Sequence, residues 1–446
     1  MSSKEFISFK RNLQIRHEVD VFIAGGGPAG IAAALAAAYN GCSVFLVEGQ
    51  GCLGGMGTAG LIPVFMQFTD GINFLAGGVG EKIYKKLIEN YGIEPYKGIG
   101  PGECAPIKPE ILKRVYDDLL IDAGVEFSLM TQLVAVDMES RETVSSVILA
   151  AKSGIFAIKA KMYIDCTGDG DLSAWAGALF EKGDENGNLM AGTLCSLWTD
   201  IDWMKVAWER QDQYLEKAFN DRIFTVEDRH LPGIFKSGDH TGAGNMGHCF
   251  NLDGTDERSL TIAFVEQRKR LMEYEKYYKK YFPGFDKMEL ISTASLMGVR
   301  ETRRITGDYK LGLDDFNKRA IFDDEIGRYA YCVDIHAANS GMAEYEKFLE
   351  EYEKLRYGIG ESYGIPYRIL TPSGLKNVLT AGRCVSSDRY IQSSIRVMPG
   401  CYITGQAAGA AASVAINGKT DTRGFDIGKL QQVIRKTGGF LPNFGK

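Results

Sequence analysis

Arginine side chains are concentrated in the segment GVRETRRITG, where Arg300, Arg303 and Arg304 lie within five positions. A guanidinium is planar and stays charged, and it binds a carboxylate through two parallel hydrogen bonds. The cluster could therefore anchor an anionic substrate. The alternative interpretation is an ordinary charged face on a solvated helix. A fourth candidate cation, Arg396, lies in SSIRVMPG, just before a segment of small residues.

Two histidines are candidates for moving a proton, because imidazole titrates near neutral pH. His336 follows an expected strand in YCVDIHAANS, and His248 lies in the glycine-rich stretch GNMGHCFNLDGTD. A structural role for each histidine is the alternative. No two histidines have a ligand spacing such as HxxxH, so the sequence predicts no metal site.

The glycines of the segment GGGPAG have the spacing of a dinucleotide-binding loop, and each position in this spacing has a physical explanation. Gly25 permits a tight turn, Gly27 lets the backbone approach a pyrophosphate, and Gly30 lets a helix pack closely on a sheet. Further along, Glu48 can accept hydrogen bonds from ribose hydroxyls. A glycine-rich structural turn is the alternative.

The elements that must position this loop lie within residues 21–47, which contain no charged side chain. Glycines at 25–27 and the Asn40-Gly41 pair break the run, so it cannot form one membrane-spanning helix. We expect instead a strand before the glycines, a helix over 28–39 and a second strand over 44–47. The sequence predicts no membrane span.

A second match to GxGxxG, at residues 242–247, follows a polar run and opens no alanine-rich helix. We interpret it as a glycine-rich loop and expect a single dinucleotide site. The segment 258–281 interleaves basic and aromatic residues as a nucleic-acid surface would, but its three glutamates favour a helix with one buried aromatic face. Other helices are expected over 81–91, 108–123, 202–219 and 341–357.

The last third of the chain repeats the pattern of the first. LKNVLTAG predicts a buried strand, and MPGCYITGQAAGAAASVA predicts a helix of small residues. Gly405 and Gly409 thin one face of this helix, so a backbone or a flat ligand can lie close to it. We therefore expect a cofactor domain built from residues 1–182 and 363–446, with a substrate or cap domain over 183–362.

The chain has 446 residues, of which 45% are hydrophobic and 24% charged, and a net charge of −6. These values are ordinary for a globular protein and give no general attraction to nucleic acid or anionic lipid. The nine cysteines never form a CxxC motif, which argues for reduced thiols in a cytoplasmic protein and against an iron–sulfur cluster.

Four motifs together resemble one known family: GGGPAG with Glu48, DCTGDGDLS, VRETRRITGDYKL, and NVLTAGRCVSSDRYIQSSIRVMPGCYITGQAAGAAA. They are similar to FAD-dependent oxidoreductases of the two-dinucleotide-binding, glutathione-reductase-like superfamily, and more narrowly to bacterial flavoproteins related to the flavin module of heterodisulfide reductases. The resemblance implies an α/β fold: a Rossmann-like FAD-binding domain of GR2 type, assembled from both chain ends, with an inserted α+β substrate or cap domain. The cysteine-rich cluster motifs of heterodisulfide reductase subunits are missing, so their iron–sulfur relay is not implied.

The resemblance also implies where FAD would bind. The pyrophosphate would lie at Gly25, Gly27, Pro28, Ala29 and Gly30, the adenosine ribose at Glu48, the flavin side at Gly54 and Gly55, and the adenine at the backbone of Val134. The phosphates or the ribityl chain would lie near Asp169, and the ribityl chain close to Gly382 and Arg383. Many relatives have an acidic residue where Arg383 stands. The helix starting near Gly400 would direct its positive end at the flavin N1 and C2 carbonyl.

As a function, the resemblance implies noncovalent FAD and hydride transfer between flavin N5 and a small polar organic substrate. The arginines would anchor the substrate, and a histidine would carry the proton. A protein or small molecule would serve as electron acceptor. Two alternatives remain open: a fumarate-reductase-like reduction of an alkene, and a non-enzymatic flavin sensor or electron-transfer protein.

Overall fold

The computed structural model of the chain describes residues 7, 9–91, 105–229, 233–347, 349–350 and 354–445. Its main sheet has seven strands in the order β5-β2-β1-β8-β7-β6, with β17 also beside β8. The parallel strands are β1 (Ile15–Ala24), β2 (Val44–Val47), β5 (Glu126–Ser128), β8 (Gly154–Asp165) and β17 (Val378–Thr380). Strands β6 (Gln132–Met138) and β7 (Val144–Ala151) continue the sheet from β8 as an antiparallel meander.

Strand β8 connects the two ends of the chain within this sheet. One of its edges pairs with β1, near the beginning of the chain. Along the other edge its first half pairs with β7, and its last three residues pair with β17, near the end of the chain. The prediction that the parallel sheet is assembled from both chain ends is therefore confirmed.

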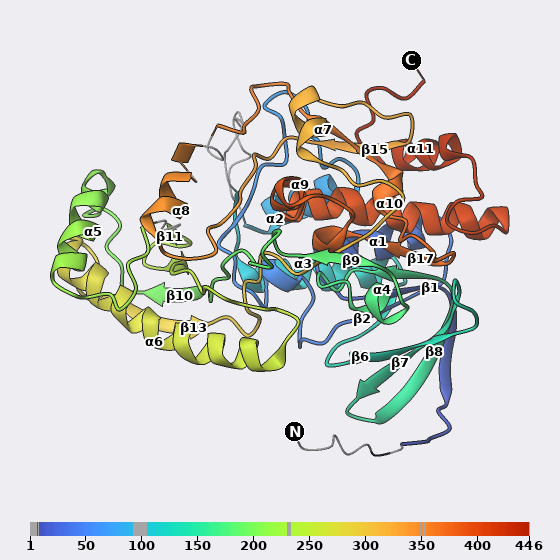
Figure 1. The fold of residues 1–446 in the computed structure, drawn as a ribbon, viewed down its shortest axis with the longest axis horizontal. Coiled ribbons are helices and arrows are strands. Elements are labelled where there is room, and N and C mark those ends of the chain that lie inside the picture. The colour runs from blue at the N-terminus through green and yellow to red at the C-terminus, as the bar shows by residue number, and fades with distance from the viewer. Residues whose placement is uncertain are drawn as a thin grey trace.

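The two faces of the sheet pack against different elements, because successive side chains of a strand point to opposite faces. Val21 and Ile23 of β1 lie in one core with helices α1 (Pro28–Tyr39) and α10 (Met398–Gly418), while Phe22 and Ala24 pack with the meander. In Figure 1 the blue α1 and the red α10 lie together on the same side of the sheet. Burial on both faces holds the carboxyl end of β1, and the loop after it, in place.

Helices α1 and α10 approach each other closely because both consist mostly of alanine and glycine. A Cβ atom on Gly405 would lie 2.1 Å from the carbonyl oxygen of Ala29, and one on Gly409 would lie 2.1 Å from that of Ala33. No side chain fits at either position. The thin face that the sequence indicated therefore receives the backbone of α1.

A second, antiparallel sheet forms the lobe on the left of Figure 1, in the order β11-β12-β10-β13. Its strands are β10 (Ser196–Thr199), β11 (Gly233–Lys236), β12 (Gly242–Asn245) and β13 (Glu289–Thr293). Helices α5 (Gln211–Asn220) and α6 (Glu257–Tyr281) share a hydrophobic cluster with these strands. Tyr274, Tyr277 and Tyr278 of α6 are buried in that cluster, which agrees with the aromatic face expected for this helix.

The expectation of a loop at residues 242–247 is wrong, because residues 242–245 form strand β12. A Cβ atom on Gly244 would lie 2.8 Å from Ser196 Oγ and 3.0 Å from Trp198 Nε1. Glycine is therefore needed for β12 to lie against the side chains of β10. The glycines of this segment serve sheet packing, and the segment opens no helix.

The remaining described elements connect these parts. The helices are α2 (Val79–Tyr91), α3 (Pro109–Asp122), α4 (Asp171–Trp175), α7 (Leu313–Lys318), α8 (Met342–Lys347), α9 (Arg389–Ile395) and α11 (Ile427–Lys436). The strands form pairs: β3 (Val64–Phe65) with β4 (Ala105–Pro106), β9 (Phe180–Lys182) with β14 (Arg303–Ile305), and β15 (Glu325–Tyr329) with β16 (Tyr363–Pro366). The helix expected over 202–219 begins only at Gln211. Part of the helix expected over 341–357, at 348 and 351–353, lies outside the described residues.

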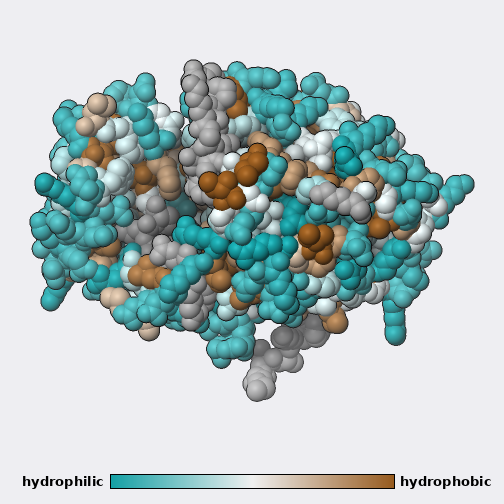
Figure 2. All heavy atoms as spheres, turned by 90° about the horizontal axis from the view of Figure 1, so that it is seen from above, coloured by the Kyte–Doolittle hydropathy of each residue, from teal (hydrophilic) through white to brown (hydrophobic). Residues whose placement is uncertain are grey.

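Large apolar surfaces are buried between these elements. The face seen in Figure 2 is mostly hydrophilic, with hydrophobic side chains in small separate patches. In the described part of the chain, no helix combines the length and the apolar composition needed to cross a membrane.

Candidate functional site

A cavity of about 680 Å³ is lined by residues from the part of the fold around the main sheet and from the lobe around the second sheet. Twelve of the residues singled out from the sequence are in its wall: Gly25, Gly27, Pro28, Ala29, Glu48, Gly55, Asp169, Arg300, His336, Gly382, Arg383 and Arg396. The fold thus brings the glycine-rich loop and two of the candidate arginines into one cavity. Seven others are outside the wall: Gly30, Gly54, Val134, His248, Arg303, Arg304 and Gly400.

The glycine-rich loop turns sharply from β1 into α1. Gly25 has a φ of +95°, and a Cβ atom there would lie 2.5 Å from the carbonyl oxygen of Cys166. A Cβ atom on Gly30 would lie 1.9 Å from the carbonyl oxygen of Gly25, so the first turn of α1 packs directly on the loop. Nothing lies within 4 Å of a Cβ built on Gly27, which leaves open space on the cavity side. The first N–H groups of α1 have no partner within the helix and favour an anion at this end.

Glu48 lies at the end of β2, where its carboxylate is tied to the loop. Its Oε2 accepts a hydrogen bond from the Gly26 N–H at 2.8 Å, and its Oε1 accepts one from the Gln50 N–H at 2.8 Å. Burial raises the pKa of Glu48, against the effect of these bonds. A carboxylate has about four lone-pair directions, so acceptor capacity remains for hydroxyl groups of a ribose.

Two of the residues outside the wall, Gly54 and Gly400, adjoin it, and a third, Val134, lies at the surface. Gly54 has a φ of +104°, and its N–H donates to the Gly26 carbonyl at 2.8 Å. Gly400 is buried in the first turn of α10, whose neighbours Val397, Met398 and Cys401 do line the cavity. The start of α10 therefore presents its positive end to the cavity. Val134 is 44% exposed on β6.

Arg383 occupies the position at which relatives carry an acid, and the structure supplies a carboxylate from another element. Arg383 Nη2 donates to Asp169 Oδ1 at 2.6 Å, and its Nε donates to the Gly168 carbonyl at 2.9 Å. Thr302 Oγ1 also donates to Asp169 Oδ1, at 2.8 Å. The loop after β8 and the loop after β17 are thereby locked together at the cavity wall. The open space at Gly27, the carboxylate of Glu48 and the start of α10 together fit a dinucleotide cofactor.

Arg300 is a buried cation in the same wall, with 7% of its surface exposed. Its guanidinium donates only to neutral acceptors: the Ala191 carbonyl at 2.7 Å, Thr193 Oγ1 at 2.8 Å and Asn245 Oδ1 at 3.4 Å. No ion pair joins it to a carboxylate of the described residues. Burial, and then repulsion from Arg396, lower the pKa of Arg300 to about 10.

Asp334, His336 and Arg396 form a connected polar group beside Arg300. His336 Nε2 lies 3.4 Å from Asp334 Oδ1, and Arg396 Nη2 lies 3.3 Å from Asp334 Oδ2. Burial alone would raise the pKa of Asp334, but His336, Arg396 and Arg300 together hold it below its ordinary value. Burial lowers the pKa of His336, with Arg300 adding repulsion. Burial thus favours the neutral form of the His336 imidazole in the cavity wall.

His248 lies directly behind His336. Its Nε2 is 2.7 Å from His336 Nδ1, and its Nδ1 is 3.1 Å from Asp228 Oδ1. The two histidines that the sequence suggested separately are thus in contact, and only His336 reaches the cavity.

Arg303 and Arg304 are held away from the cavity by carboxylates. Arg303 Nη1 donates to Asp171 Oδ1 at 2.7 Å. Arg304 pairs with Glu301, which is fully buried and also accepts from Arg389 Nε at 3.1 Å. Arg303 and Arg304 belong to β14, whereas Arg300 precedes this strand. Of the clustered arginines, only Arg300 therefore lines the cavity.

Sequence reasoning did not single out Asp334, Asp228 or Asn245. Asp334 stands two positions before His336, and residues two apart in an extended segment point to one side, so DIH carried a usable signal. Asp228 and Asn245 reach the site through the tertiary packing of the second lobe, for which the sequence offered no pattern.

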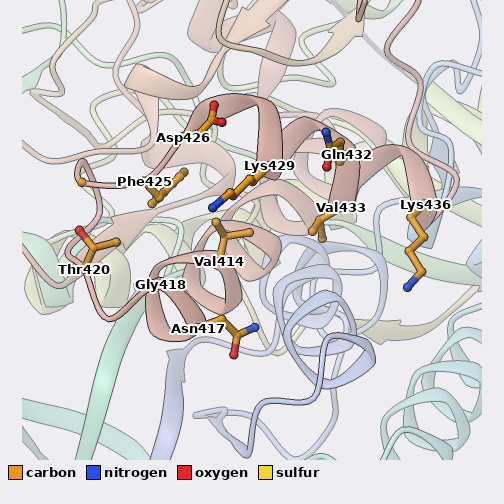
Figure 3. A pocket seen from close by; sticks show the side chains of 11 residues that line it. Val414, Asn417, Gly418, Thr420, Phe425, Asp426, Lys429, Gln432, Val433 and Lys436 are labelled. Carbon is orange, nitrogen blue, oxygen red and sulfur yellow. The ribbon is translucent and has the colours of Figure 1, made fainter.

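A second hollow, of about 510 Å³, lies between the end of α10 and α11 (Figure 3). Val414 and Asn417 come from α10, and Lys429 and Val433 from α11. Asp426 at its rim caps α11 by accepting from the Gly428 N–H at 2.8 Å. It shares no lining residue with the first cavity. Across the described residues there is no group of three or more His, Cys, Asp and Glu side chains that could hold a metal ion.

A family profile described as FAD dependent oxidoreductase matches residues 20–434, nearly the whole chain. The protein therefore belongs to the family of FAD-dependent oxidoreductases, and its cofactor is FAD. The glycine-rich loop, Glu48 and the start of α10 are the residues that would hold it. Comparison with curated proteins gives no match.

Solved structures of flavin enzymes resemble the chain at low identity. A geranylgeranyl bacteriochlorophyll reductase-like protein from Thermoplasma acidophilum is 13% identical, with a TM-score of 0.46, covering 95% of this chain and 84% of the other. The flavin-dependent brominase Bmp2 is 11% identical, with a TM-score of 0.48, covering 94% and 83%. The p-nitrophenol 4-monooxygenase PnpA from Pseudomonas putida is 11% identical, with a TM-score of 0.43, covering 94% and 84%. Similarity this distant carries no argument about the substrate.

Proposed function

We propose that the enzyme transfers hydride between FAD and a small organic acid whose carboxylate is bound by Arg300 and Arg396. The observation that carries this proposal is that the buried Arg300 guanidinium donates only to neutral acceptors and forms no ion pair with a carboxylate of the described residues, although Asp334 and Asp228 attract it from farther away. A buried guanidinium without a directly bonded carboxylate is costly. A substrate carboxylate in the cavity would supply the missing negative charge and could accept two N–H groups at once.

The proton would be handled by His336. FAD, when bound, accepts or donates a hydride at N5. In the oxidation of a hydroxy acid to an oxo acid, the hydride leaves the carbon and the hydroxyl proton passes to His336 Nε2. Asp334 lies 3.4 Å from that nitrogen and would stabilise the resulting imidazolium. An electron acceptor, either a protein or a small molecule, belongs to the same proposal.

Part of the cavity wall is apolar and suggests the rest of the substrate. Phe235, Leu260, Phe264 and Met297 line it from the second lobe. Burial of apolar substrate surface there would contribute about 25 cal/mol per Å². We therefore favour acids with an aromatic or branched apolar group over lactate-sized ones.

Reduction of a carbon–carbon double bond in an unsaturated acid is the second candidate. It is favoured by one observation: the pKa of Arg300, lowered to about 10, makes this guanidinium a better proton donor than an exposed one. Reoxidation of the reduced protein by cinnamate or fumarate, with no reduction by hydroxy acids, would support this direction.

The proposal also includes three more detailed statements, on the subgroup of the family, the mode of FAD binding and the location in the cell. The relation to the flavin module of heterodisulfide reductases depends on the quoted motifs. Noncovalent binding of FAD is expected because burial raises the pKa of Cys401, the thiol in the flavin-side wall, to about 12 and so suppresses its nucleophilic form. Denaturation should release intact FAD. A cytoplasmic location agrees with eight free cysteines among the described residues.

The test uses carboxylate probes on the FAD-loaded enzyme. Benzoate and phenylacetate are titrated while the flavin absorbance is followed, and lactate, mandelate and phenyllactate are tried anaerobically as reductants. Arg300→Met should retain FAD and weaken benzoate binding at least about tenfold, the loss expected from one charge-assisted contact. Arg303→Met is the matched comparison, and its benzoate affinity should stay within about twofold of wild type. Equal benzoate affinity in wild type and Arg300→Met would refute the proposal.

A further inference from the structure

A line of buried polar side chains runs from the cavity wall into the second lobe. His336 Nδ1 lies 2.7 Å from His248 Nε2, and His248 Nδ1 lies 3.1 Å from Asp228 Oδ1 and 3.0 Å from Asp228 Oδ2. Exposed fractions are 6% for His336, 1% for His248 and 6% for Asp228. Contacts this short between buried rings must be hydrogen bonds with defined proton positions.

The backbone around His248 fixes its ring in this line. Asp228 Oδ2 accepts a hydrogen bond from the His248 N–H at 2.9 Å, so one carboxylate holds both the backbone and the ring. The His248 carbonyl accepts from Arg270 Nη1 at 2.8 Å and from Gln267 Nε2 at 3.4 Å, both on α6. These bonds hold the His248 backbone, while the contact of its Nδ1 with Asp228 holds the ring toward His336.

The proton positions follow from the end of the line. An ionised carboxylate only accepts hydrogen bonds, so His248 Nδ1 must carry the hydrogen directed at Asp228. In a neutral His248 the other nitrogen, Nε2, is then an acceptor. The 2.7 Å contact with His248 is a far closer hydrogen-bond distance than the 3.4 Å approach of Asp334 Oδ1 to His336 Nε2, so His336 Nδ1 donates to His248 and Nε2 is left unprotonated.

We propose that Asp228 and His248 are positioning residues that fix the tautomer of His336, so that Nε2 is the atom that accepts the substrate proton. The inference deepens the proposed function and rests on it for the identity of the base. When Nε2 takes a proton, the hydrogen on His336 Nδ1 can move to His248 Nε2. The positive charge then lies on His248, next to the Asp228 carboxylate, and the pair as a whole has gained one proton, the one taken from the substrate.

The charges facing the two rings favour this division of roles. Among the described residues, the charged and titratable groups near His336 are Arg300, Arg396, Asp334 and His248, and those near His248 are Asp228, Arg270, Tyr274 and His336. Two arginines beside His336 disfavour a lasting imidazolium there, while Asp228 favours the charge on His248. The pair can therefore take a proton at the cavity and carry its charge away from the two arginines.

The experiment reads the tautomer directly and needs no substrate. In the FAD-loaded protein labelled with 15N-histidine, long-range 1H–15N spectra at pH 7 distinguish imidazoles protonated on Nδ1 from those protonated on Nε2. The sequence has five histidines, and His336→Gln identifies the His336 signals. We expect wild-type His336 to carry hydrogen on Nδ1. In Asp228→Asn, the ratio of the two His336 tautomers should shift at least about tenfold toward the form protonated on Nε2, since a charge-assisted hydrogen bond is lost.

His17 provides the internal control, because it lies on β1 beside Glu126 and should keep its spectrum in Asp228→Asn. Wild-type His336 protonated on Nε2, or an unchanged ratio in Asp228→Asn, would overturn the inference. The wild-type spectrum decides the matter even if the variant does not fold. Failure of the proposed function shows separately, as unchanged benzoate binding in Arg300→Met.

Discussion

Asp169 and Arg383 form an ion pair across 214 positions of the chain, with Nη2 of the guanidinium 2.6 Å from Oδ1 of the carboxylate. Arg383 Nη1 also donates to the Val299 carbonyl at 2.6 Å, just before the segment that carries Arg300. Three distant segments are thus connected at one side chain. Arg383 thereby fixes the loop after β8, the loop after β17 and the segment before Arg300 relative to one another in the cavity wall.

A double-mutant cycle should measure the interaction energy between Asp169 and Arg383. Asp169→Asn or Arg383→Met alone leaves one partly buried charge without its partner, and each should lower the free energy of unfolding by about 1–3 kcal/mol. The double variant removes both charges and should lose about 0.5–3 kcal/mol less than the sum of the two single losses. Urea unfolding of the FAD-loaded proteins provides the three values. Simple additivity would mean that the pair contributes only through separate contacts.

Glu48→Gln should weaken FAD binding. The amide loses the charge and one acceptor atom, so the ribose hydroxyls and the Gly26 N–H compete for fewer lone pairs. The loss should be on the order of 1.5–3 kcal/mol, or roughly ten- to a hundredfold in affinity. Titration of the apoprotein with FAD measures it. Glu126→Gln, on the neighbouring strand β5, is the control and should bind FAD like wild type.

The cofactor half of the fold was predictable because each local signal agreed with the final packing. Val21–Val47 contains buried strand, glycine turn and alanine helix in an order that only one arrangement satisfies. The closing helix was equally clear, since Gly405 and Gly409 require a close neighbour. Glycine at 242 and 244 misled the prediction, because the same residue serves turns and tight sheet packing, and only the position of Trp198 distinguishes them.

The candidate catalytic residues were less predictable. Sequence spacing treated Arg300, Arg303 and Arg304 alike, although tertiary contacts give Arg303 and Arg304 carboxylate partners and leave Arg300 without one. The contact between His248 and His336 joins residues 88 positions apart, so no spacing rule could find it. The division into 1–182, 183–362 and 363–446 stays a prediction.

Asp171 should make stability depend on pH. Burial, with repulsion from Asp169 and Asp165, raises its pKa to about 6. The folded state therefore binds this proton more tightly than the unfolded chain does. The resulting stabilisation of the fold is fully present below about pH 4 and is lost as the pH rises through 6. Asp171→Asn should gain about 1 kcal/mol more at pH 7.5 than at pH 5, relative to wild type. Urea unfolding at both pH values measures this difference, in which any pH-independent loss of the Arg303 contact cancels. An equal effect at both values would contradict the raised pKa.

Gly405→Ala should damage stability and cofactor binding together. Its Cβ atom would lie 2.1 Å from the Ala29 carbonyl oxygen and 2.9 Å from the Ala29 Cα, both backbone atoms that no rotamer change can move aside. Helix α1 must therefore shift away from α10, at a cost of about 1–3 kcal/mol. Ala29 lies in the cavity wall beside Gly27 and Pro28, so the shift also displaces the N–H groups that would bind the pyrophosphate. A loss of about 1.4 kcal/mol in binding free energy would weaken the affinity for FAD tenfold.

Gly418→Ala, in the last turn of the same helix, is the control: its Cβ would meet only Thr420 Cγ2, at 3.4 Å. That variant should be about 0.5–1 kcal/mol more stable than wild type, because alanine loses less conformational entropy in a helix. Thermal unfolding and FAD titration of both variants test the argument, and normal FAD affinity in Gly405→Ala would show that the position of α1 does not control the pyrophosphate loop.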